Sequence, residues 1–354
     1  KTGKKAFRET DTLDTFVDSS WYFLRFLDSK NENSPFDINK IQKFTPVDKY
    51  IGGIEHAILH LLYSRFFTKA IRDIYKLKIN EPFLELFTQG MITHKTFQSK
   101  QKKWLRPNEV ILKNDILVDI FDGQPVKEGA IEKMSKSKRN TIEPKEILDN
   151  YGLDATRIFM ISDSPPDRNL EWTEEGIQGS KNLINRIKRY FENEATIINK
   201  EQERKIKKFI FDMNENILSF SFNKCVANIY TLLNFLEKNK AYTGNTENGK
   251  KILICLFPII PSLVSIIFKE KFNVLDLKEL SWSTVEISEV EDENLNLPIQ
   301  INGRFITTYS INKNYDETKL LNIILKVAKI KEKVKDSPIR KTIHVKNKIL
   351  NIII

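Results

Sequence analysis

The run EKMSKSKRN at residues 132–140 concentrates charge that could bind phosphate. Four cationic side chains, those of Lys133, Lys136, Lys138 and Arg139, lie within seven residues and alternate with small hydroxyl groups. Lysine acts on phosphate as a mobile point charge and serine donates hydrogen bonds, so such a loop could close on a polyphosphate. A solvated basic loop is the alternative, and the run by itself leaves both interpretations open.

A second candidate site lies in residues 50–65, which read YIGGIEHAILHLLYSR. Gly52 and Gly53 would let the backbone approach a ligand closely where a helix begins. Glu55, in the first turn of that helix, could accept hydrogen bonds from ribose hydroxyl groups. This pattern indicates a nucleotide site at the junction of a strand and a helix.

His56 and His60 are four residues apart, so they share one face of the predicted helix. Two histidines next to a glutamate could also belong to a zinc hydrolase, but the order here is EHxxxH rather than HExxH. The other two histidines, His94 and His344, have no evident ligands near them. We therefore expect no metal site, and satisfied core histidines remain the plainest alternative.

A third candidate is the segment DTFVDSSWY at residues 14–22. Phe16, Ser19 and Tyr22 are three apart, which places them on one face if the segment is helical. Aromatic residues at this spacing can also simply pack in a core.

The elements around these candidates predict an α/β unit. An apolar strand at 47–51, a glycine turn, a helix over 54–76 and a further strand and turn at 83–92 are typical of a fold that binds ligands at the carboxyl ends of its strands. Short strands are expected around 109–121, with a turn at Asp122-Gly123. The lysine-rich loop at 133–140 follows.

The second half of the sequence changes character. Helices begin after Pro144 and at 173–175, and the pattern stays helical from about 174 to 270, with Gly244 and Gly249 in a linker. The run 252–268 is apolar but shorter than the ~20 residues of a membrane span, and it predicts one buried helix kinked by proline. No signal peptide is visible.

The last 60 residues predict a ββαββ module. Asn302-Gly303 lies between strands at 297–301 and 304–309, which is the strongest hairpin signal in the chain. A helix is expected over 317–335. A second hairpin joins 339–345 to 349–354 around residues 346–348.

Composition limits the possible functions. The 354 residues carry 57 Lys and Arg against 47 Asp and Glu, giving a net charge of +10 that favours a polyanionic partner such as nucleic acid. A hydrophobic fraction of 40% excludes wholesale disorder. Only two cysteines, Cys225 and Cys255, are present, which argues against a disulfide framework and fits a reducing, cytoplasmic location.

Several motifs together resemble one family, leucyl-tRNA synthetase of the bacterial type, a class I aminoacyl-tRNA synthetase. The similarity extends over essentially the whole chain in order and spacing. It rests on KMSKS at 133–137 and on residues 8–22, 50–67, 151–157 (YGLDATR), 170–172 (LEW) and 301–304 (INGR).

The resemblance implies a role for each candidate. Lys136 would be the principal catalytic contact to the ATP phosphates and Lys133 would assist, because preorganised cations stabilise the charge that develops on departing pyrophosphate. ATP would enter with Mg²⁺ as the substrate complex, and no tightly bound cofactor is expected. The implied ATP-binding residues are Gly52, Gly53, Glu55, Gln89, Gly90, Met91, Lys133, Met134, Ser135, Lys136 and Ser137. The implied leucine-binding residues are Phe16, Ser19, Tyr22, Tyr50, His56 and His60.

The implied fold class is α/β plus all-α plus α+β. Residues 1–132 would form the second half of a Rossmann-type catalytic domain, and 133–173 the lysine loop and a stem-contact region. Residues 174–290 would form a helical anticodon-binding bundle, and 291–354 a small domain that contacts tRNA(Leu). Basic surfaces on the last two suit a phosphate backbone.

The chain also departs from the family pattern. It lacks the His-x-Gly-His type motif of the first half of the nucleotide-binding fold and the editing domain, and it begins at Lys1 rather than Met. We therefore expect a carboxyl-terminal part, either a fragment or one subunit of a split enzyme, that cannot activate leucine without its missing amino-terminal half. The main alternative is a non-catalytic tRNA-binding protein derived from such a half. No membrane partner is expected.

Overall fold

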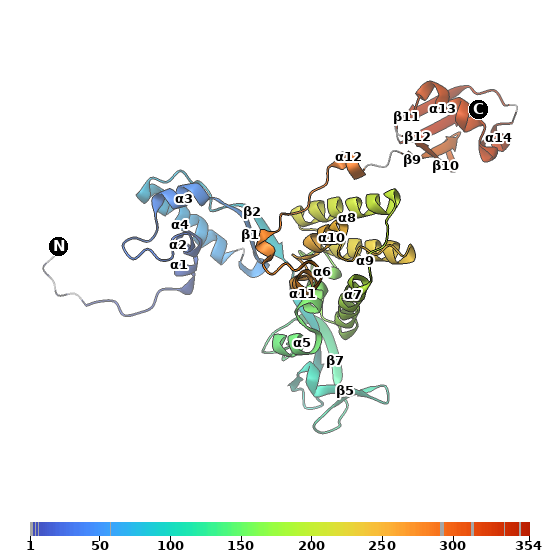
Figure 1. Cartoon of the computed structure of the whole chain (residues 1–354). Helices are drawn as coiled ribbons and strands as arrows, with labels where there is room; N and C mark the ends of the chain where they lie inside the picture. Colours follow the sequence, from blue (N-terminus) through green and yellow to red (C-terminus); the bar gives the residue numbers. More distant parts are fainter. Residues whose placement is uncertain are drawn as a thin grey trace. The chain divides into compact units, whose positions relative to one another are not determined.

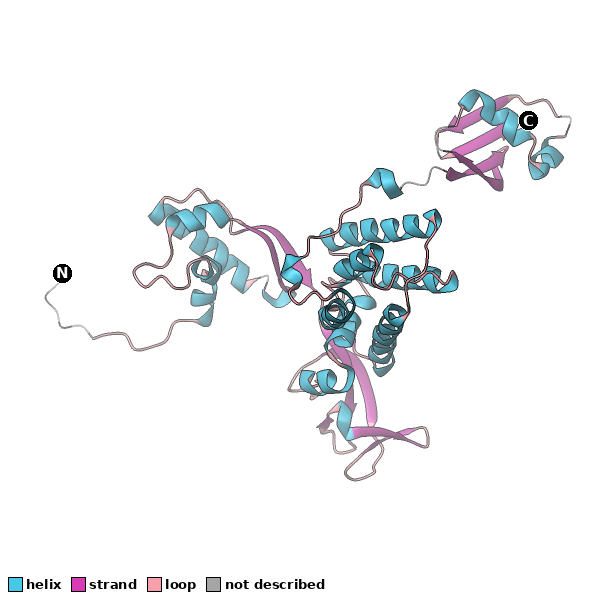
Figure 2. Cartoon of the chain, in the orientation of Figure 1, coloured by secondary structure: helices cyan, strands magenta, loops and turns pink. Residues whose placement is uncertain are grey.

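The computed structural model describes residues 3, 5, 7–56, 58–290, 294–312, 315–335, 337–346 and 348–354, without the side chains of 279, 294, 317 and 318. Figures 1 and 2 show the helices and strands of the chain, which divides into two compact units. The first comprises Lys1–Asn199 and Asp212–Ser283, and the second comprises Lys200–Phe211 and Thr284–Ile354.

The first unit begins with an α/β element. Its members are α1 (Thr15–Ser19), α2 (Tyr22–Phe26), α3 (Ile38–Phe44), β1 (Val47–Gly53), a 3-10 turn η1 (Ile54–His56), α4 (Leu59–Tyr75) and β2 (Phe83–Gln89). Strands β1 and β2 pair in parallel from Val47↔Phe83 to Gly53↔Gln89, as the strand–helix–strand pattern predicts. A small core holds these elements together: Phe23, Leu24, Phe36, Ile41, Leu77 and Ile79.

The helix predicted over 54–76 is shorter than expected. The chain first makes the tight turn η1, and α4 begins only at Leu59. Ala57 lies outside the described residues. The reason is local: the Glu55 carboxylate folds back over Gly53, where an added Cβ would lie 2.4 Å from Oε2. A regular helical start would carry this side chain away from Gly53.

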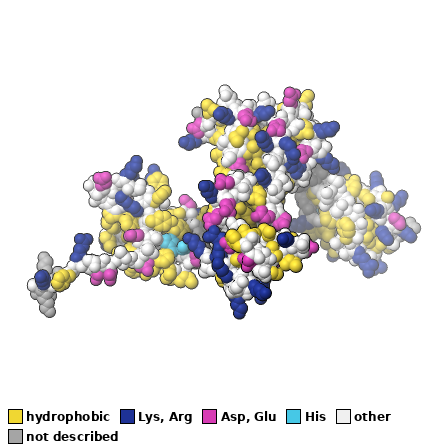
Figure 3. Space-filling model, turned by 90° about the horizontal axis from the view of Figure 1, so that it is seen from below, with side chains coloured by type: hydrophobic (Ala, Val, Ile, Leu, Met, Phe, Trp, Pro, Cys, Tyr) yellow, Lys and Arg dark blue, Asp and Glu magenta, His cyan; other side chains and the backbone are white. Residues whose placement is uncertain are grey.

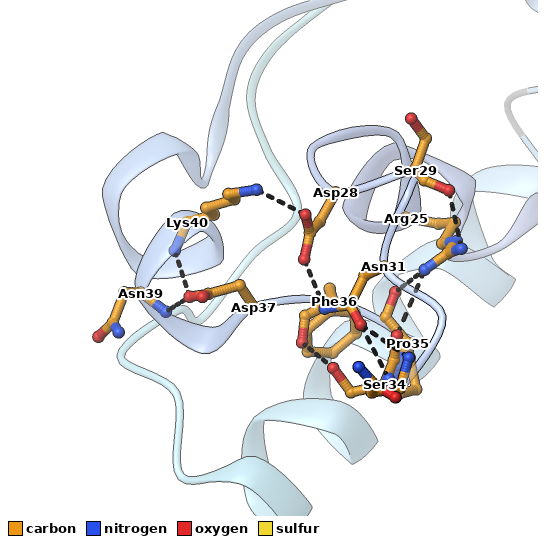
Figure 4. Close-up of polar contacts among 11 residues, drawn as sticks. Arg25, Asp28, Ser29, Asn31, Ser34, Pro35, Phe36, Asp37, Asn39 and Lys40 are labelled. Atoms are coloured by element: carbon orange, nitrogen blue, oxygen red, sulfur yellow. Dashed lines mark hydrogen bonds and ion pairs between the residues drawn. The ribbon is translucent and has the colours of Figure 1, made fainter.

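The connection between α2 and α3 is fixed by polar contacts (Figure 4). The Arg25 guanidinium donates to the carbonyl oxygens of Ser29 and Pro35 at 2.8 and 3.0 Å. Asp28 accepts from Lys40 at 2.5 Å, and Asp37 caps α3 by accepting from two of its backbone N–H groups. These bonds hold the loop while Phe36 fills the core beneath it, so α2 has a defined position.

An antiparallel sheet carries the next segment. Its order is β4-β3-β7, with β8 paired to β3 in parallel, and β5 and β6 form a separate hairpin. The bounds are β3 (Ile92–Gln98), β4 (Trp104–Leu105), η2 (Pro107–Glu109), β5 (Val110–Lys113), β6 (Ile116–Asp119), β7 (Lys127–Lys133) and β8 (Leu170–Glu171). The turn predicted at Asp122-Gly123 is present, with Gly123 at φ +68°. Lys133 closes β7, so the lysine loop starts at Met134.

Helices α5 (Pro144–Tyr151) and α6 (Leu153–Ser162) follow the lysine loop. Asp154, which is buried in α6, accepts from the backbone N–H groups of Ser262 and Leu263 at 3.1 and 2.6 Å. Arg157 donates to the carbonyl oxygens of Pro258 and Ile259 at 2.6 and 3.0 Å. The YGLDATR segment therefore ties α6 to a turn about a hundred residues away.

Long helices occupy the middle of the chain, as predicted. They are α7 (Glu174–Glu192), α8 (Lys200–Leu218), α9 (Phe222–Lys238), α10 (Glu247–Leu256) and α11 (Pro261–Phe272), followed by η3 (Leu277–Glu279). Thr173 caps α7. No described helix is long and apolar enough to cross a membrane. Cys225 in α9 and Cys255 in α10 are free and buried, and burial raises the pKa of their thiols to about 11 and about 12.

Two predictions in this region are wrong. The run 252–268 is not one kinked helix, because α10 ends at Leu256 and Pro261 starts α11 at a position where its missing N–H is harmless. Gly249 does not lie in a linker but in the first turn of α10. There its N–H donates to the Thr246 hydroxyl, and an added Cβ would lie 2.5 Å from the Gly244 carbonyl oxygen.

The second unit contains a four-stranded sheet of order β10-β9-β12-β11. Its elements are α12 (Ile287–Val290), β9 (Asn294–Ile301), β10 (Arg304–Asn312), α13 (Glu317–Leu325), α14 (Ala328–Val334), β11 (Lys341–Val345) and β12 (Ile349–Ile353). Both predicted hairpins are confirmed, with Asn302 and Gly303 at φ +49° and +79° in the first turn. Asn347, in the second turn, lies outside the described residues.

The single helix predicted over 317–335 is wrong. Val327 adopts an extended conformation and separates α13 from α14, so the module is ββααββ. The break has a packing reason, because it lets both short helices place side chains on one core. That core includes Leu320, Ile324, Ile330 and Val334 with Leu297 and Ile352 of the sheet.

Candidate active site

A pocket of about 260 Å³ lies at the carboxyl end of β1. Its lining comprises Phe16, Ser19, Tyr22, Tyr50, Ile51, Gly52, His56 and His60. All six residues predicted for leucine binding are therefore brought together, although they come from five separate elements. Ile51 was missed because an apolar strand residue carries no signal of its own in the sequence.

Hydrogen bonds order one wall of this pocket. The hydroxyl groups of Tyr22 and Tyr50 are 2.9 Å apart, and the Tyr50 hydroxyl lies 2.5 Å from Nε2 of His60. Burial, together with the Tyr22 hydrogen bond, raises the pKa of Tyr50 above its ordinary value. Burial also lowers the pKa of His60, and the neighbouring His56 adds to that effect. His60 is therefore neutral at pH 7, so Nε2 can share a single proton with Tyr50.

Aromatic stacking fixes the same wall. The Tyr50 ring stacks on Phe83 with a centroid distance of 3.8 Å, and Phe16 stacks on Tyr63 at 6.4 Å. Tyr22 starts α2 instead of continuing α1, yet it still faces the pocket with Phe16 and Ser19. The pocket therefore presents rigid rings with a few placed polar atoms, as small-molecule sites do.

Glu55 lies beside this pocket and next to the lysine loop. Its carboxylate lies 3.8 Å from Nζ of Lys133. A hydrogen bond from its own backbone N–H holds the pKa of Glu55 below the ordinary value, and the charge of Lys133 adds to this. The structure therefore places Gly52, Gly53, Glu55 and Lys133, all predicted for ATP, in one neighbourhood.

The backbone N–H groups of Gly90 and Met91, two of the residues predicted for ATP binding, form hydrogen bonds within the protein. Gln89 pairs with Gly53 at the end of the parallel ladder. The Gly90 N–H donates to the Pro166 carbonyl oxygen at 2.9 Å, and the Met91 N–H donates to Asn169 Oδ1 at 2.9 Å. An added Cβ at Gly90 would lie only 1.9 Å from the carbonyl oxygen of Arg168. These donors therefore anchor the β2–β3 junction.

The lysine loop is organised by Asn140, a residue whose role was missed. Its fully buried amide accepts from the Ser135 N–H at 2.9 Å and donates to the carbonyl oxygens of His94, Glu132 and Lys133 at 3.2–3.4 Å. Asparagine with both functions satisfied can close such a loop, while neither Asp nor Ala can. Met134 packs on the adjoining core, and the Ser135 and Ser137 hydroxyls are 3.2 Å apart.

The four cations of the loop fall into two classes. Lys138 pairs with Glu132, and Arg139 pairs with Glu109 at 2.5 Å. Lys133 has the longer contact with Glu55. The ammonium group of Lys136 is exposed, and no ion pair joins it to another described residue. Two cations are therefore engaged in structure, while Lys136 is available to a ligand.

The two histidines of the pocket lie edge to face, with ring centroids 6.2 Å apart. Within the described part of the chain, no group of three or more His, Cys, Asp or Glu side chains is placed to hold a metal ion. A second cavity, of about 470 Å³, lies between β3, η2 and α5, and none of the predicted site residues lines it.

Comparisons with known proteins identify relatives of this chain. Residues 119–173 match the family model described as tRNA synthetases class I (I, L, M and V). The chain is 39% identical to a leucine–tRNA ligase of Zymomonas mobilis and 38% identical to that of Novosphingobium aromaticivorans, over 100% and 99% of its length. It covers 42% of each of these relatives.

The chain corresponds to the carboxyl-terminal part of a class I leucyl-tRNA synthetase. A solved structure agrees with this. The crystal structure of an Agrobacterium radiobacter K84 LeuRS in a ternary complex with tRNA and LeuAMS superposes with a TM-score of 0.78 at 29% identity. The match covers 99% of this chain and 44% of that LeuRS. The chain thus spans less than half the length of the leucyl-tRNA synthetases it matches.

Proposed function

We propose that this chain provides one half of the catalytic site of a leucine–tRNA ligase. In the first step, the leucine carboxylate attacks the α-phosphate of ATP, which forms leucyl-adenylate and releases pyrophosphate. In the second, the leucyl group passes to tRNA(Leu) and AMP leaves. Each step conserves atoms and charge without any further reactant.

The observation that carries this proposal is the pocket at the carboxyl end of β1. Its volume of about 260 Å³ suits an amino acid with an aliphatic side chain rather than a larger ligand. Phe16 and Ile51 offer apolar contact, while Tyr22, Tyr50 and His60 offer polar atoms in fixed positions. Leucine needs both kinds of contact, one for its side chain and one for its ammonium and carboxylate groups.

The lysine loop would act on the leaving group. Lys136 is the exposed cation without an ion pair among the described residues, so it would approach the β- and γ-phosphates of ATP, which enters as its Mg²⁺ complex. Lys133 would assist once a phosphate displaces its contact with Glu55. Cations that are already in place when pyrophosphate departs stabilise the transition state more than the ground state. Asn140 would preserve the loop geometry throughout.

The helical region 174–290 and the module 291–354 would bind tRNA(Leu), with residues 1–132 and 133–173 forming the catalytic half-domain and the stem-contact region. The net charge of +10 favours binding to a nucleic acid such as tRNA, because phosphate contacts dominate that affinity. The cytoplasm is the expected compartment.

The activity would require the part of the enzyme that this chain does not match. The relatives are more than twice as long as the matched region. That second part would come from the same polypeptide or from a separate subunit. Alone, the chain is expected to bind tRNA without activating leucine.

Leucine-dependent ATP–pyrophosphate exchange tests the proposal. It would be measured for this chain alone and with the amino-terminal part of a leucine–tRNA ligase supplied. Exchange only in the mixture supports the proposal, and exchange by the chain alone contradicts the need for a second part. If neither gives exchange while tRNA still binds, the chain is a non-catalytic tRNA-binding protein.

A further inference from the structure

The second cavity, of about 470 Å³, lies between β3, η2 and α5, away from the residues predicted for leucine and ATP. Phe97 and Ile147 form its buried wall, and Val110 and Ile142 are half-buried beside them. It is larger than the pocket of about 260 Å³ at the carboxyl end of β1. A cavity of this size, with an apolar wall and several polar groups, has the character of a small-molecule site.

Carboxylates dominate the polar part of the lining. Glu143 precedes α5 and Glu146 lies in its first turn, and within the described residues neither side chain forms an ion pair. The third carboxylate, that of Glu174, accepts from the Tyr151 hydroxyl at 2.5 Å. Arg106 is the one lysine or arginine among the described residues of the lining. The cavity is therefore acidic, although the chain as a whole carries a net charge of +10.

The surroundings of the cavity are mixed in character. Figure 3 looks at the molecule from below, the side on which α5 and the β5–β6 hairpin lie in Figure 1. Acidic side chains lie there among hydrophobic and basic ones. The overall positive charge therefore does not describe the local surface.

His94 adds a neutral acceptor to the lining. Its Nδ1 lies 2.8 Å from the Lys95 carbonyl oxygen, which can only accept, so Nδ1 carries the proton. In the neutral imidazole, Nε2 is then a bare acceptor. Within the part of the chain that the structure describes, no three His, Cys, Asp or Glu groups are placed to hold one metal ion. The spread of these acceptors instead suits a ligand that carries several donors.

The charges select the class of ligand. An anion such as a nucleotide phosphate would meet three carboxylates and one guanidinium, so it would be repelled. A hydrocarbon chain can lie along Phe97 and Ile147 and lose apolar surface to the protein. Ammonium groups spaced along that chain can donate to the carboxylates, and such charge-assisted hydrogen bonds are stronger than neutral ones.

We propose that this cavity binds a linear aliphatic polyamine, a hydrocarbon chain with protonated amino groups. The inference does not depend on the proposed function. The position of the cavity gives binding a consequence, because the Asn140 amide that closes the lysine loop donates to the His94 carbonyl oxygen. Arg139 of the loop also pairs with Glu109 of η2. A bound polyamine would therefore lie against the segments that hold the lysine loop.

Isothermal titration calorimetry of spermidine into the full chain, freed of nucleic acid, tests the proposal. We expect saturable binding of one spermidine per chain. Binding should weaken as the salt concentration rises, because salt screens the attraction between ammonium groups and carboxylates. The neutral compound 1,8-octanediol, whose chain is of similar length, should not bind.

The double variant Glu143→Gln/Glu146→Gln should weaken spermidine binding ~10-fold or more, because it removes two charges and keeps the shape of the side chains. Both side chains are exposed, so the variant should keep the wild-type circular dichroism. Glu247→Gln/Glu270→Gln is the matched control, since it removes the same charge from two exposed carboxylates on α10 and α11. Glu247 lies in the first turn of its helix, as Glu146 does.

Binding that the Glu143/Glu146 variant weakens and the control variant does not supports the proposal. Equal weakening by the two variants, or weakening by neither, overturns it, because spermidine would then bind elsewhere on the protein. The absence of saturable spermidine binding, or equally tight binding of 1,8-octanediol, also overturns it. None of these outcomes involves ATP–pyrophosphate exchange, so the proposed function is tested separately.

Discussion

The Tyr50 hydroxyl lies 2.5 Å from Nε2 of His60, and this pair joins strand β1 to helix α4. The two rings are nearly parallel, at 25°, with centroids 5.7 Å apart. Because His60 is buried and its pKa is lowered, protonation of its imidazole would place an uncompensated charge in the protein interior. It would also make both ring nitrogens donors, so Nε2 could no longer accept from Tyr50.

Stability should therefore depend on pH through His60. The folded pKa of His60 lies below the ordinary value of 6.5 for histidine, so below pH 6.5 the unfolded chain binds more protons than the native one. The contribution of His60 is complete above pH 6.5 and is lost as the pH falls through the folded pKa. We expect the Tm of the wild type to fall between pH 7 and pH 5 more steeply than that of His60→Gln. Parallel curves would contradict this.

Asn140→Ala should destabilise the lysine loop and its surroundings. The substitution leaves the Ser135 N–H and three carbonyl oxygens without their buried partner, and such losses cost about 2–4 kcal/mol in total. Urea unfolding measures the change. Asn108→Ala, an exposed asparagine in the adjoining η2 turn, should shift the free energy of unfolding by less than about 0.5 kcal/mol. Equal effects of the two variants would contradict the conclusion that Asn140 organises the lysine loop.

Replacing Lys136 and replacing Lys138 should affect different properties, the rate of catalysis in one case and the stability in the other. In the reconstituted enzyme, Lys136→Ala should lower the rate of leucine activation by about 10²–10³-fold with little change in leucine affinity, because its charge acts on the departing pyrophosphate. Lys138→Ala should instead lower stability, since Lys138 pairs with Glu132 and lies 5.7 Å from the Trp104 ring centroid. Pre-steady-state adenylate formation and thermal melts distinguish the two. A Lys136→Ala enzyme with wild-type kinetics would disprove the assigned role.

Two glycines should respond to alanine in opposite directions. Gly90→Ala would place a methyl group against the backbone of Arg168 and Asn169, and relieving that overlap must break the Gly90–Pro166 hydrogen bond. We expect a loss of more than about 2 kcal/mol in the free energy of unfolding. Gly179, inside α7, has open space around it, so Gly179→Ala should stabilise by about 0.5–1 kcal/mol. Chemical denaturation of both variants checks the signs.

Local signals made much of the fold predictable. Strand β1, helix α7 and the hairpin at Asn302-Gly303 follow from periodicity, a threonine cap and a turn dipeptide, all of which act within a few residues. The breaks at Val327 and before Pro261 were missed because apolar periodicity continues across both. At Val327, the packing of two short helices on a shared core determines where the first helix ends. At Pro261, the proline starts a new helix.

The sequence predicted which residues line the pocket, but not the hydrogen bonds that they form. The resemblance named Tyr22, Tyr50 and His60, but the hydrogen-bond chain among them depends on segments 28 and 10 residues apart. Asn140 and Asp154 illustrate the same limit. Each is an ordinary polar residue in the sequence, and its importance comes from buried partners, which for Asp154 lie more than a hundred residues away.

The burial of both cysteines has a practical consequence for experiments on this protein. Cys225 and Cys255 are enclosed within helices, and their thiols remain protonated well above neutral pH. Alkylating reagents attack thiolates, so neither side chain should react in the folded state. A single cysteine introduced on the surface, for instance in place of Ser137, would then be the one labelled position. A fluorophore attached there would report on the surroundings of the lysine loop, without prior removal of the native thiols.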